Sequence, residues 1–223
     1  MVVNVIHVKD LVKKYDGRTA VLDGLSFDVD EGEFVMVCGK SGCGKTTLLN
    51  ILGGLDRPTS GDVAIDDESI IGLSEDALAR LRLEKIGFVF QDYNLLLDLT
   101  VRENVALPLK FSKKRGEERV DDLLDKFDIV HIANETANKV SGGEAQRAAI
   151  ARAMMNKPRI ILADEPTGNL DKENTENVIS AFELARKDFG TTVILATHDS
   201  DLERHATKRL HLSDGAGRID PAG

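Results

Sequence analysis

Residues 34–46 of the chain read FVMVCGKSGCGKT. Residues 34–38 are all apolar, which is typical of a short strand that is covered on both faces. Gly39, Gly42 and Gly44 allow successive backbone N–H groups to turn toward one anion without interference from Cβ atoms. A helical pattern begins after these glycines, so the positive end of a helix would point at the same anion. The stretch therefore predicts a strand, a phosphate-binding loop and a helix.

Lys45 and Thr46, at the end of this stretch, supply the side chains that a bound nucleotide needs. A lysine here places a positive charge near the β- and γ-phosphates, and a threonine hydroxyl can bind Mg²⁺. The alternative is a plain glycine-rich turn. The preceding strand and the following helix are the context that a phosphate loop requires. We therefore expect the loop to bind ATP together with Mg²⁺.

Length, composition and charge limit the classes of protein to which the chain can belong. The 223 residues are 42% hydrophobic and 30% charged, which is typical of a globular domain rather than a disordered segment. A net charge of −9 argues against broad binding to nucleic acid. No apolar run approaches the roughly 20 residues of a membrane-spanning helix, and no secretory leader is evident. Two cysteines do not make a disulfide framework. We expect a cytoplasmic protein that binds no nucleic acid.

The order of the remaining elements predicts an α/β fold. Further strand candidates are apolar or alternating and end at turn signals; they cover residues 3–8, 21–29, 63–71 and 86–91. Residues 101–158 read as helices, and residues 116–127 show the apolar spacing of an amphipathic helix. Strands at 160–163 and 192–196 flank a helix over 172–189, which implies a right-handed parallel crossover. A helical insertion therefore interrupts an α/β core.

Acidic and imidazole side chains follow two of the expected strands. Asp164 and Glu165 come directly after the strand at 160–163, and His198 follows the strand that begins at Thr192. Ligands of open α/β sheets bind at the carboxyl ends of the strands. Asp164 suits the shell of Mg²⁺ through water, and Glu165 could polarise an attacking water. The acidic pair could also be a polar exit from the strand, and a histidine at a strand end is more often structural.

A second candidate anion site lies at residues 141–147, which read SGGEAQR. Ser141 followed by Glu144 forms the pattern of a capping box at a helix N-terminus. Capping alone does not need Gly142 and Gly143, which permit close approach to the backbone. Free N–H groups and a serine hydroxyl at a helix start can bind an anion. This site lies far in sequence from the first one.

Together these segments resemble the ATP-binding-cassette ATPases over nearly the whole chain. Alone, Gln91 could be a loop residue and Asp171 a helix N-cap. Their order and spacing with the other motifs strengthen the resemblance. The matched motifs are the adenine-stacking aromatic at Tyr15, the Walker A loop at Gly39 to Thr46, the Q-loop at Gln91, the signature at Ser141-Gly142-Gly143-Glu144, the Walker B strand with its glutamate at Ile160 to Glu165, the D-loop at Asp171 and the switch histidine at His198.

The resemblance implies a P-loop NTPase core with an antiparallel β subdomain and an inserted α-helical subdomain. It divides the chain into core residues 1–97, helical residues 98–157 and core residues 158–223. It also implies a Mg²⁺-dependent ATPase that forms a head-to-tail homodimer. Ser141 and Gly143 of one copy would close over ATP held by Lys45 of the other. The dimer would drive a separate transmembrane permease subunit, so the chain would lie on the inner face of the membrane, with residues 91–101 facing the permease.

The resemblance assigns a role to each expected site residue. Glu165, His198 and Lys45 would be catalytic, and Thr46, Gln91 and Asp164 would hold the metal. The residues expected to contact ATP are Tyr15, Gly39, Ser41, Gly42, Cys43, Gly44, Lys45, Thr46, Thr47, Gln91, Ser141, Gly142, Gly143 and Asp171.

Further segments look like the lipoprotein-releasing, macrolide-exporting and cell-division cassettes (LolD, MacB and FtsE types). These segments are residues 53–61, 103–109 and 163–171. The alternative is a soluble cassette ATPase without a transport role, in iron–sulfur assembly, DNA repair or translation. Such proteins typically carry a long insertion or a second cassette, or match residues 169–171 less well.

The chain departs from the common family pattern at four positions. Val140, Glu144 and Ala145 replace the usual residues around the signature, although Glu is frequent in this subgroup. Contact with ATP should survive, because Ser141 and the glycines are kept, but the affinity of the dimer is left open. Cys43 replaces the usual Ser or Ala of the phosphate loop, and we expect its thiol to be accessible only without nucleotide.

Overall fold

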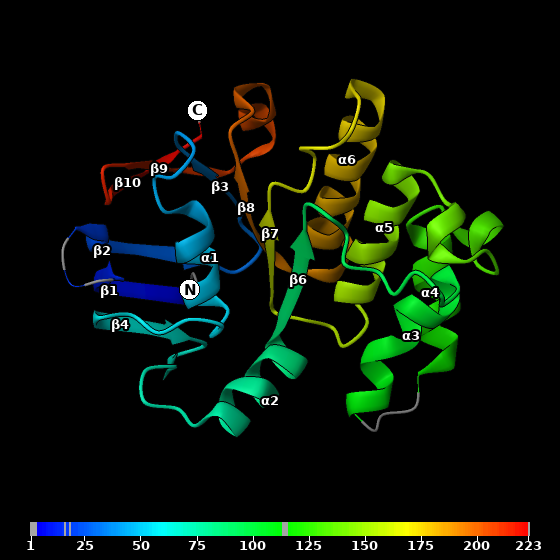
Figure 1. The fold of residues 1–223 in the computed structure, drawn as a ribbon, viewed down its shortest axis with the longest axis horizontal. Helices are drawn as coiled ribbons and strands as arrows, with labels where there is room; N and C mark the ends of the chain where they lie inside the picture. The colour runs from blue at the N-terminus through cyan, green and yellow to red at the C-terminus, as the bar shows by residue number, and fades with distance from the viewer. Residues whose placement is uncertain (1–3, 16, 18, 113–115, 223) are drawn as a thin grey trace.

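The computed structural model describes residues 4–222 except 16, 18 and 113–115, and a six-stranded sheet lies at its centre (Figure 1). The strands of this sheet are β3 (Phe34–Cys38), β6 (Ile86–Phe90), β7 (Ile160–Asp164), β8 (Thr192–Thr197), β9 (Lys208–Ser213) and β10 (Ala216–Pro221). Their order is β10-β9-β3-β8-β7-β6, and all neighbours are parallel except β10 and β9. The carboxyl ends of β3, β7 and β8 therefore meet at one edge.

A second, antiparallel sheet lies beside the central one (Figure 1). Its order is β2-β1-β4-β5, formed by β1 (Asn4–Lys14), β2 (Ala20–Asp30), β4 (Ser60–Ile65) and β5 (Glu68–Ser69). Helix α1 (Lys45–Leu52) packs between the two sheets, because its buried residue Leu48 shares one hydrophobic core with Val8 of β1 and Val35 of β3. The antiparallel sheet thus covers the helix that follows the phosphate loop.

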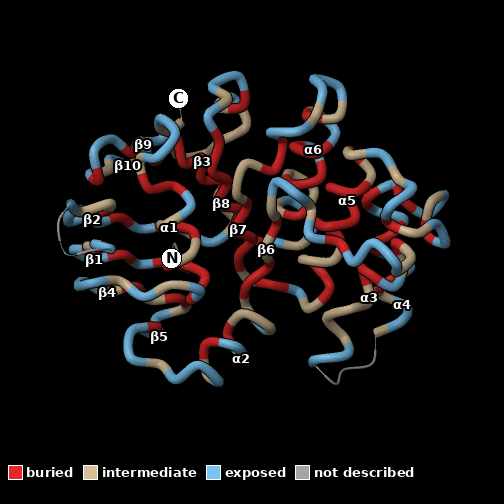
Figure 2. Tube along the Cα trace, viewed as in Figure 1, coloured by how far each residue is buried: buried red, intermediate tan, exposed pale blue. Residues whose placement is uncertain are grey.

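The opposite face of the central sheet is covered by helices. They are α3 (Val101–Ser112), α4 (Glu117–Lys126), α5 (Gly142–Ala153) and α6 (Lys172–Phe189), together with the short 3-10 helices η1 (Val130–Ile132) and η2 (Ala137–Lys139). Because side chains alternate along a strand, Phe34 and Met36 of β3 enter this second core while Val35 and Val37 enter the first. Figure 2 shows the resulting band of buried chain along β3, β8 and β7.

The fold class expected from the sequence is confirmed, with local corrections. The strand expected over residues 63–71 is wrong as one element: Asp66 and Asp67 have φ values of 49° and 61°, and the turn they form separates β4 from β5. Helix α2 (Glu75–Lys85) was not predicted, because only Leu78 and Leu81 are buried in it and its apolar period is weak. Strands β9 and β10 and the 3-10 helix η3 (Ser200–His205) were also missed.

The ends of two helices near the candidate sites are well defined. The helix after the phosphate loop ends at Leu52 with Gly53 as its C-cap, and the helix that Ser141 caps ends at Ala153. The strand expected at residues 160–163 extends by one residue and includes Asp164. None of the described helices is long and apolar enough to cross a membrane. Helices α3, α4 and α5 fall within the expected helical segment of residues 98–157, and the domain boundaries stay a prediction.

Candidate nucleotide-binding site

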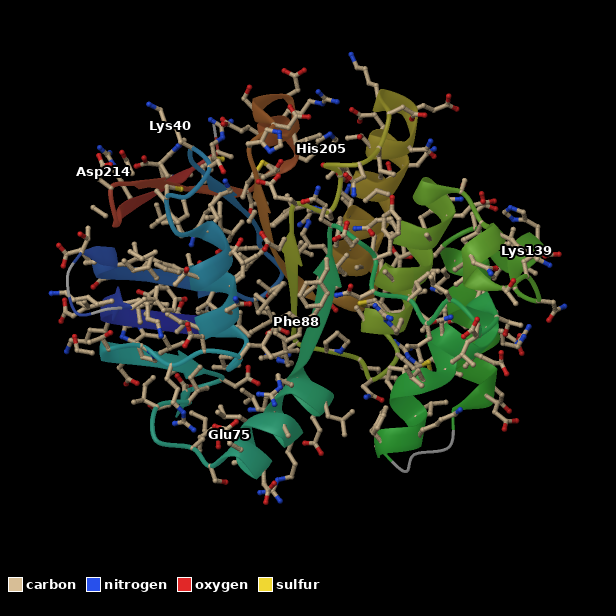
Figure 3. All side chains as sticks on the ribbon, in the orientation of Figure 1. Lys40, Glu75, Phe88, Lys139, His205 and Asp214 are labelled. Atoms are coloured by element: carbon tan, nitrogen blue, oxygen red, sulfur yellow. The ribbon has the colours of Figure 1, made fainter. Side chains whose placement is uncertain are left out.

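The phosphate loop connects the end of β3 to the start of α1. Gly39 has a φ of 158°, and a Cβ on it would come within 2.5 Å of the Cys43 sulfur and 2.6 Å of the Leu212 carbonyl oxygen. Only glycine fits there, and the Cys43 side chain is turned toward the start of the loop. Lys40 lies at the rim of the loop (Figure 3). The backbone therefore has the tight turn that the sequence predicted.

Lys45 joins the phosphate loop to the end of β7. Its side chain is only 7% exposed; its Nζ donates to the Gly39 carbonyl oxygen at 3.0 Å and lies 3.4 Å from Glu165 Oε1. A buried ammonium needs such partners, because an unpaired charge inside a protein is costly. Residues that are 120 positions apart in sequence thus form one charged cluster, as expected from the parallel strands.

Asp164 and Thr46 form the side of this cluster that suits a cation. Burial raises the pKa of the Asp164 carboxyl, and a hydrogen bond from the Thr46 hydroxyl opposes that rise. Asp164 Oδ1 is buried and has no hydrogen-bond partner in the described part of the chain. A buried carboxylate oxygen without a partner is unusual in a native structure and indicates a site for a ligand or ion.

Glu165 lies between Lys45 and His198. Its Oε2 is 2.9 Å from His198 Nδ1 and accepts the His198 backbone N–H at 3.3 Å. Its φ of 46° is uncommon for a residue other than glycine, and its backbone N–H is held by the Ala196 carbonyl at 2.9 Å. Strained positions of this kind are often found at functional sites. The structure brings together the three residues that the sequence predicted to be catalytic.

Tyr15 lies beside Thr47 of α1. The Tyr15 hydroxyl donates to Asp56 Oδ2 at 2.8 Å and is 3.5 Å from the Thr47 hydroxyl, while the ring is half exposed. Lys13 Nζ lies 4.6 Å from the centre of the ring and 2.6 Å from Asp56 Oδ1. Sequence reasoning missed Lys13 and Asp56, which fix the tyrosine in place. In the sequence, the only indication of a role for these two residues was that Lys13 stands two positions before the expected aromatic residue.

Gln91 makes contacts that differ from the role expected for it. Its Nε2 donates to Asn169 Oδ1 at 3.2 Å, and Asn169 Nδ2 donates to Asp92 Oδ1 at 3.3 Å. These bonds join the segment after β6 to the segment after β7. The structure thus places Gln91 against Asn169, and its role as a metal ligand stays a prediction.

The second predicted anion site lies at the N-terminus of α5. Ser141 is the N-cap and forms the expected capping box with Glu144. A Cβ on Gly142 would lie 2.7 Å from the Tyr93 hydroxyl, and one on Gly143 would lie 2.2 Å from Asn174 Oδ1. The two glycines therefore allow close packing within the subunit, which the sequence did not predict.

Asp171 and Asn174 connect this second site to α6. Asp171 is the N-cap of α6 and accepts the Asn174 backbone N–H at 2.8 Å, and its role as the D-loop residue stays a prediction. The Asn174 side-chain amide also donates to both Asp171 carboxylate oxygens, at 3.0 and 3.1 Å. Sequence reasoning missed Asn174, which contacts both Gly143 and Asp171.

The helices that follow the two sites pack on different faces of the central sheet. Helix α1, which follows the phosphate loop, belongs to the core on one face, and α5 belongs to the core on the other. Figure 1 shows β6 and β7 between them. The fold and the loop define the class of the chain as a P-loop nucleotide-binding protein with a second helix terminus away from its loop.

Comparisons with known proteins identify the family. The pattern of the ABC transporter family matches residues 22–168, more than half of the chain. The ABC transporter ATP-binding protein YxdL of Bacillus subtilis (strain 168) is 43% identical over 95% of this chain and 84% of its own length. The lipoprotein-releasing system ATP-binding protein LolD 1 of Chlorobium chlorochromatii (strain CaD3) is 40% identical over 95% of this chain and 88% of its own length.

Solved structures show the same similarity. A dimeric post-hydrolysis state of the ATP-binding cassette MJ0796, bound to ADP and Pi, superposes with a TM-score of 0.87 at 40% identity and covers 98% of this chain and 99% of that one. CbiO1 of Clostridium perfringens, part of the ABC transporter complex cbiONQ, gives 0.91 at 28% identity over 98% and 89%. The chain belongs to the ABC transporter family. It is the ATPase subunit of such a transporter, as the sequence predicted.

Proposed function

We propose that the chain binds MgATP at its phosphate loop and hydrolyses it as one half of a head-to-tail homodimer. The observation that carries this proposal is the contact of Lys45 and His198 with the same carboxylate, Glu165. Without a nucleotide, Glu165 is the anion that accompanies Lys45. A triphosphate on the loop would compete for Lys45 and leave Glu165 beside the terminal phosphate.

In this proposal, each residue expected at the first site takes part in binding ATP or in hydrolysing it. Lys45 and the loop amides hold the β- and γ-phosphates, and the half-exposed ring of Tyr15 offers a face for adenine. Glu165 orients a water and accepts its proton as the water oxygen attacks the γ-phosphorus and the bond to ADP breaks. His198, 2.9 Å from Glu165, keeps that carboxylate in place. The loop residues that complete the ATP site are Gly39, Ser41, Gly42, Cys43, Gly44, Thr46 and Thr47.

Magnesium fits the residues present. Thr46 and the unpartnered oxygen of Asp164 would hold it, and Gln91 would join them if its amide leaves Asn169. Mg²⁺ commonly uses one or two protein oxygens and completes its shell with phosphate oxygens and water. When bound, it would neutralise charge on the β- and γ-phosphates. The described residues hold no cluster of three or more acidic, His or Cys side chains that could hold a metal ion by themselves.

The second site completes the first from another copy in this proposal. Ser141, Gly142 and Gly143 at the start of α5, with Asp171 nearby, would face the ATP on the partner's loop. The support is that α1 and α5 pack on opposite faces of the central sheet, so the two sites are separate within one subunit, together with the dimeric cassette MJ0796 among the similar structures. Two copies arranged head to tail would bring each phosphate loop against the other copy's α5.

The partner that ATP hydrolysis drives would be a transmembrane permease subunit. The 40% identical relative is an ATP-binding protein of a lipoprotein-releasing system, which supports the same subgroup for this chain. Leu96 and Leu97 are 50% and 60% exposed in the segment of residues 91–101 that would meet the permease. Exposed neighbouring leucines suit a protein interface. The chain would then lie on the inner face of the membrane, without nucleic acid.

The variant Glu165→Gln tests the composite site. It keeps the loop and Lys45 but removes the carboxylate that accepts the proton, so ATP should bind while hydrolysis falls by about a hundredfold or more. A stable ATP-bound dimer is expected by size exclusion with light scattering. Glu118→Gln, which removes an exposed carboxylate of α4, is the matched control. A Glu165→Gln protein that stays monomeric with saturating MgATP would contradict the proposed dimer.

A further inference from the structure

A carboxylate already occupies the donors of the second site. The Ser141 hydroxyl and backbone N–H both donate to Glu144 Oε2, at 2.6 and 2.8 Å. These bonds from Ser141, with the contact of His131, hold the pKa of Glu144 below its usual range. The positive end of α5 also favours a negative charge at this position. Glu144 is therefore charged at neutral pH and acts as the internal anion of this helix terminus.

His131 of η1 faces the other oxygen of the same carboxylate. Its Nε2 lies 3.0 Å from Glu144 Oε1, and its side chain is half exposed. The neighbouring cations are directed elsewhere: Arg147 of α5 donates to the Phe127 carbonyl oxygen at 3.1 Å, and Lys126 of α4 lies over the Phe189 ring at 4.9 Å. The charge of His131 contributes to the lowered pKa of Glu144.

These contacts matter because of the proposed function, on which this inference rests. If Ser141 donates its hydroxyl to the terminal phosphate of ATP on another copy, the hydroxyl must leave Glu144. The carboxylate then stays close to a polyanionic phosphate, and two like charges at short distance repel each other. A protonated imidazole beside the carboxylate would offset this repulsion. Histidine is the side chain that gains or loses its charge between about pH 5 and pH 8.

We propose that Glu144 and His131 are positioning residues for Ser141. In the separate subunit Glu144 holds the Ser141 hydroxyl away from any nucleotide and opposes closure of the dimer. Protonated His131 draws Glu144 aside and offsets its charge, so closure on ATP is favoured at lower pH. The competing explanation is that the three residues only cap α5, and a cap alone gives no such dependence.

The substitution Glu144→Gln separates these explanations. Glutamine also completes a capping box at this position, so α5 keeps its N-terminus while the charge is removed. The measurement is the dissociation constant of the dimer by sedimentation velocity, in the Glu165→Gln background with saturating MgATP, at about pH 6 and pH 8. We expect Glu144→Gln to tighten the dimer by about tenfold at the higher pH, where the parent lacks the compensating imidazolium.

Two further variants complete the comparison. His131→Gln should keep the dimer weak at both pH values, because the carboxylate stays and its cation is lost. Glu118→Gln removes an exposed carboxylate of α4 and should leave both the affinity and its pH dependence as in the parent. The terminal phosphate of ATP also titrates in this range in every variant, so the informative quantity is the difference in pH dependence between each variant and the parent.

The possible outcomes are distinct. A dimer that forms in all variants, with the same affinity and pH dependence in Glu144→Gln as in the parent, would overturn the role of Glu144 and His131 and leave the proposed function standing. An absence of ATP-dependent dimers in every variant at both pH values would overturn the proposed function, and this inference with it. A tighter and less pH-dependent Glu144→Gln dimer supports both.

Discussion

The phosphate loop and the N-terminus of α5 are both helix starts suited to an anion, but different charges face them. The loop is followed by Lys45, a buried cation that forms an ion pair with Glu165. The start of α5 holds a carboxylate of its own, Glu144, on both donors of Ser141. The first terminus has a cation, which pairs with Glu165 from the end of β7, whereas the donors of the second hold a carboxylate of the same helix.

In the proposed dimer, this difference explains why one chain can bind ATP but needs a second copy to close over it. A cation and free amides give the loop affinity for phosphate in a single subunit. At α5 an incoming phosphate must first displace Glu144, so binding there gains little unless other contacts of a dimer accompany it. The two termini are therefore unequal partners. Each of the following experiments changes one of them and leaves the other intact.

The largest effect is expected from Lys45→Ala. The change removes the cation of the first terminus and leaves Glu165 with His198 as its remaining partner. Loss of one group that stabilises the transition state typically lowers a rate by about a hundredfold to a thousandfold. We expect a loss of this size in steady-state ATPase activity, with weaker binding of ATP in a nucleotide titration.

Lys40→Ala is the matched control for Lys45→Ala. Lys40 lies at the rim of the same loop and is exposed, so its removal changes the net charge equally without changing the contacts of Glu165. A similar loss of ATP affinity in both variants would show that the loop attracts ATP by its overall charge. The difference between the two termini in affinity for phosphate would then not depend on Lys45.

The first terminus was far easier to predict from sequence than the second. The glycines, Lys45 and the strands ending at Cys38 and Asp164 are local signals, and parallel strands bring their ends together. The packing at the second terminus depends on Asn174, which meets Gly143 only after α5 and α6 have packed together. Such contacts come from tertiary structure and leave no local pattern.

The same limit explains the other errors in the sequence analysis. Helix α2 buries only Leu78 and Leu81, so its apolar period is too weak to read. The bond of Gln91 to Asn169 joins two segments that follow different strands, and neither residue indicates the other in sequence. By contrast, the capping roles of Ser141 and Asp171 depend on residues three positions away, and both were read from the sequence, that of Asp171 as the alternative to a D-loop.

The next largest effect is expected in the rates at which a maleimide modifies the two cysteines, Cys38 before the phosphate loop and Cys43 within it. Burial, with the nearby Glu203 carboxylate, raises the pKa of the Cys38 thiol to about 11. At about pH 8 roughly one thousandth of such a thiol is ionised, against about a quarter for a free cysteine. Cys43 is only partly buried. We therefore expect a maleimide to modify Cys43 at least about a hundredfold faster than Cys38, measured by peptide mass spectrometry.

The same measurement with MgATP tests the first terminus alone, because MgATP would occupy only that terminus in the separate subunit. It should slow the modification of Cys43 and leave that of Cys38 unchanged. Cys43 reacting at one rate with and without saturating nucleotide would mean that ATP does not cover the loop at this residue. The inverse pattern, in which Cys38 reacts first, would contradict the raised pKa of its buried thiol.

The smallest effect is expected from Ser141→Ala at the second terminus. The change removes a helix N-cap, which costs about 1 kcal/mol of stability, and removes the hydroxyl that would reach the partner's ATP. Binding of ATP to the separate subunit should stay as in the parent, while activity at low protein concentration falls by about tenfold because closure is weaker.

Ser74→Ala is the matched control, since Ser74 caps α2 by the same kind of bond, which it accepts from the Ala77 N–H at 3.3 Å. Equal losses of activity in the two variants would reduce the role of Ser141 to capping, and the second terminus would then be structural. A loss confined to Ser141→Ala, restored by raising the protein concentration, assigns it to closure of the dimer.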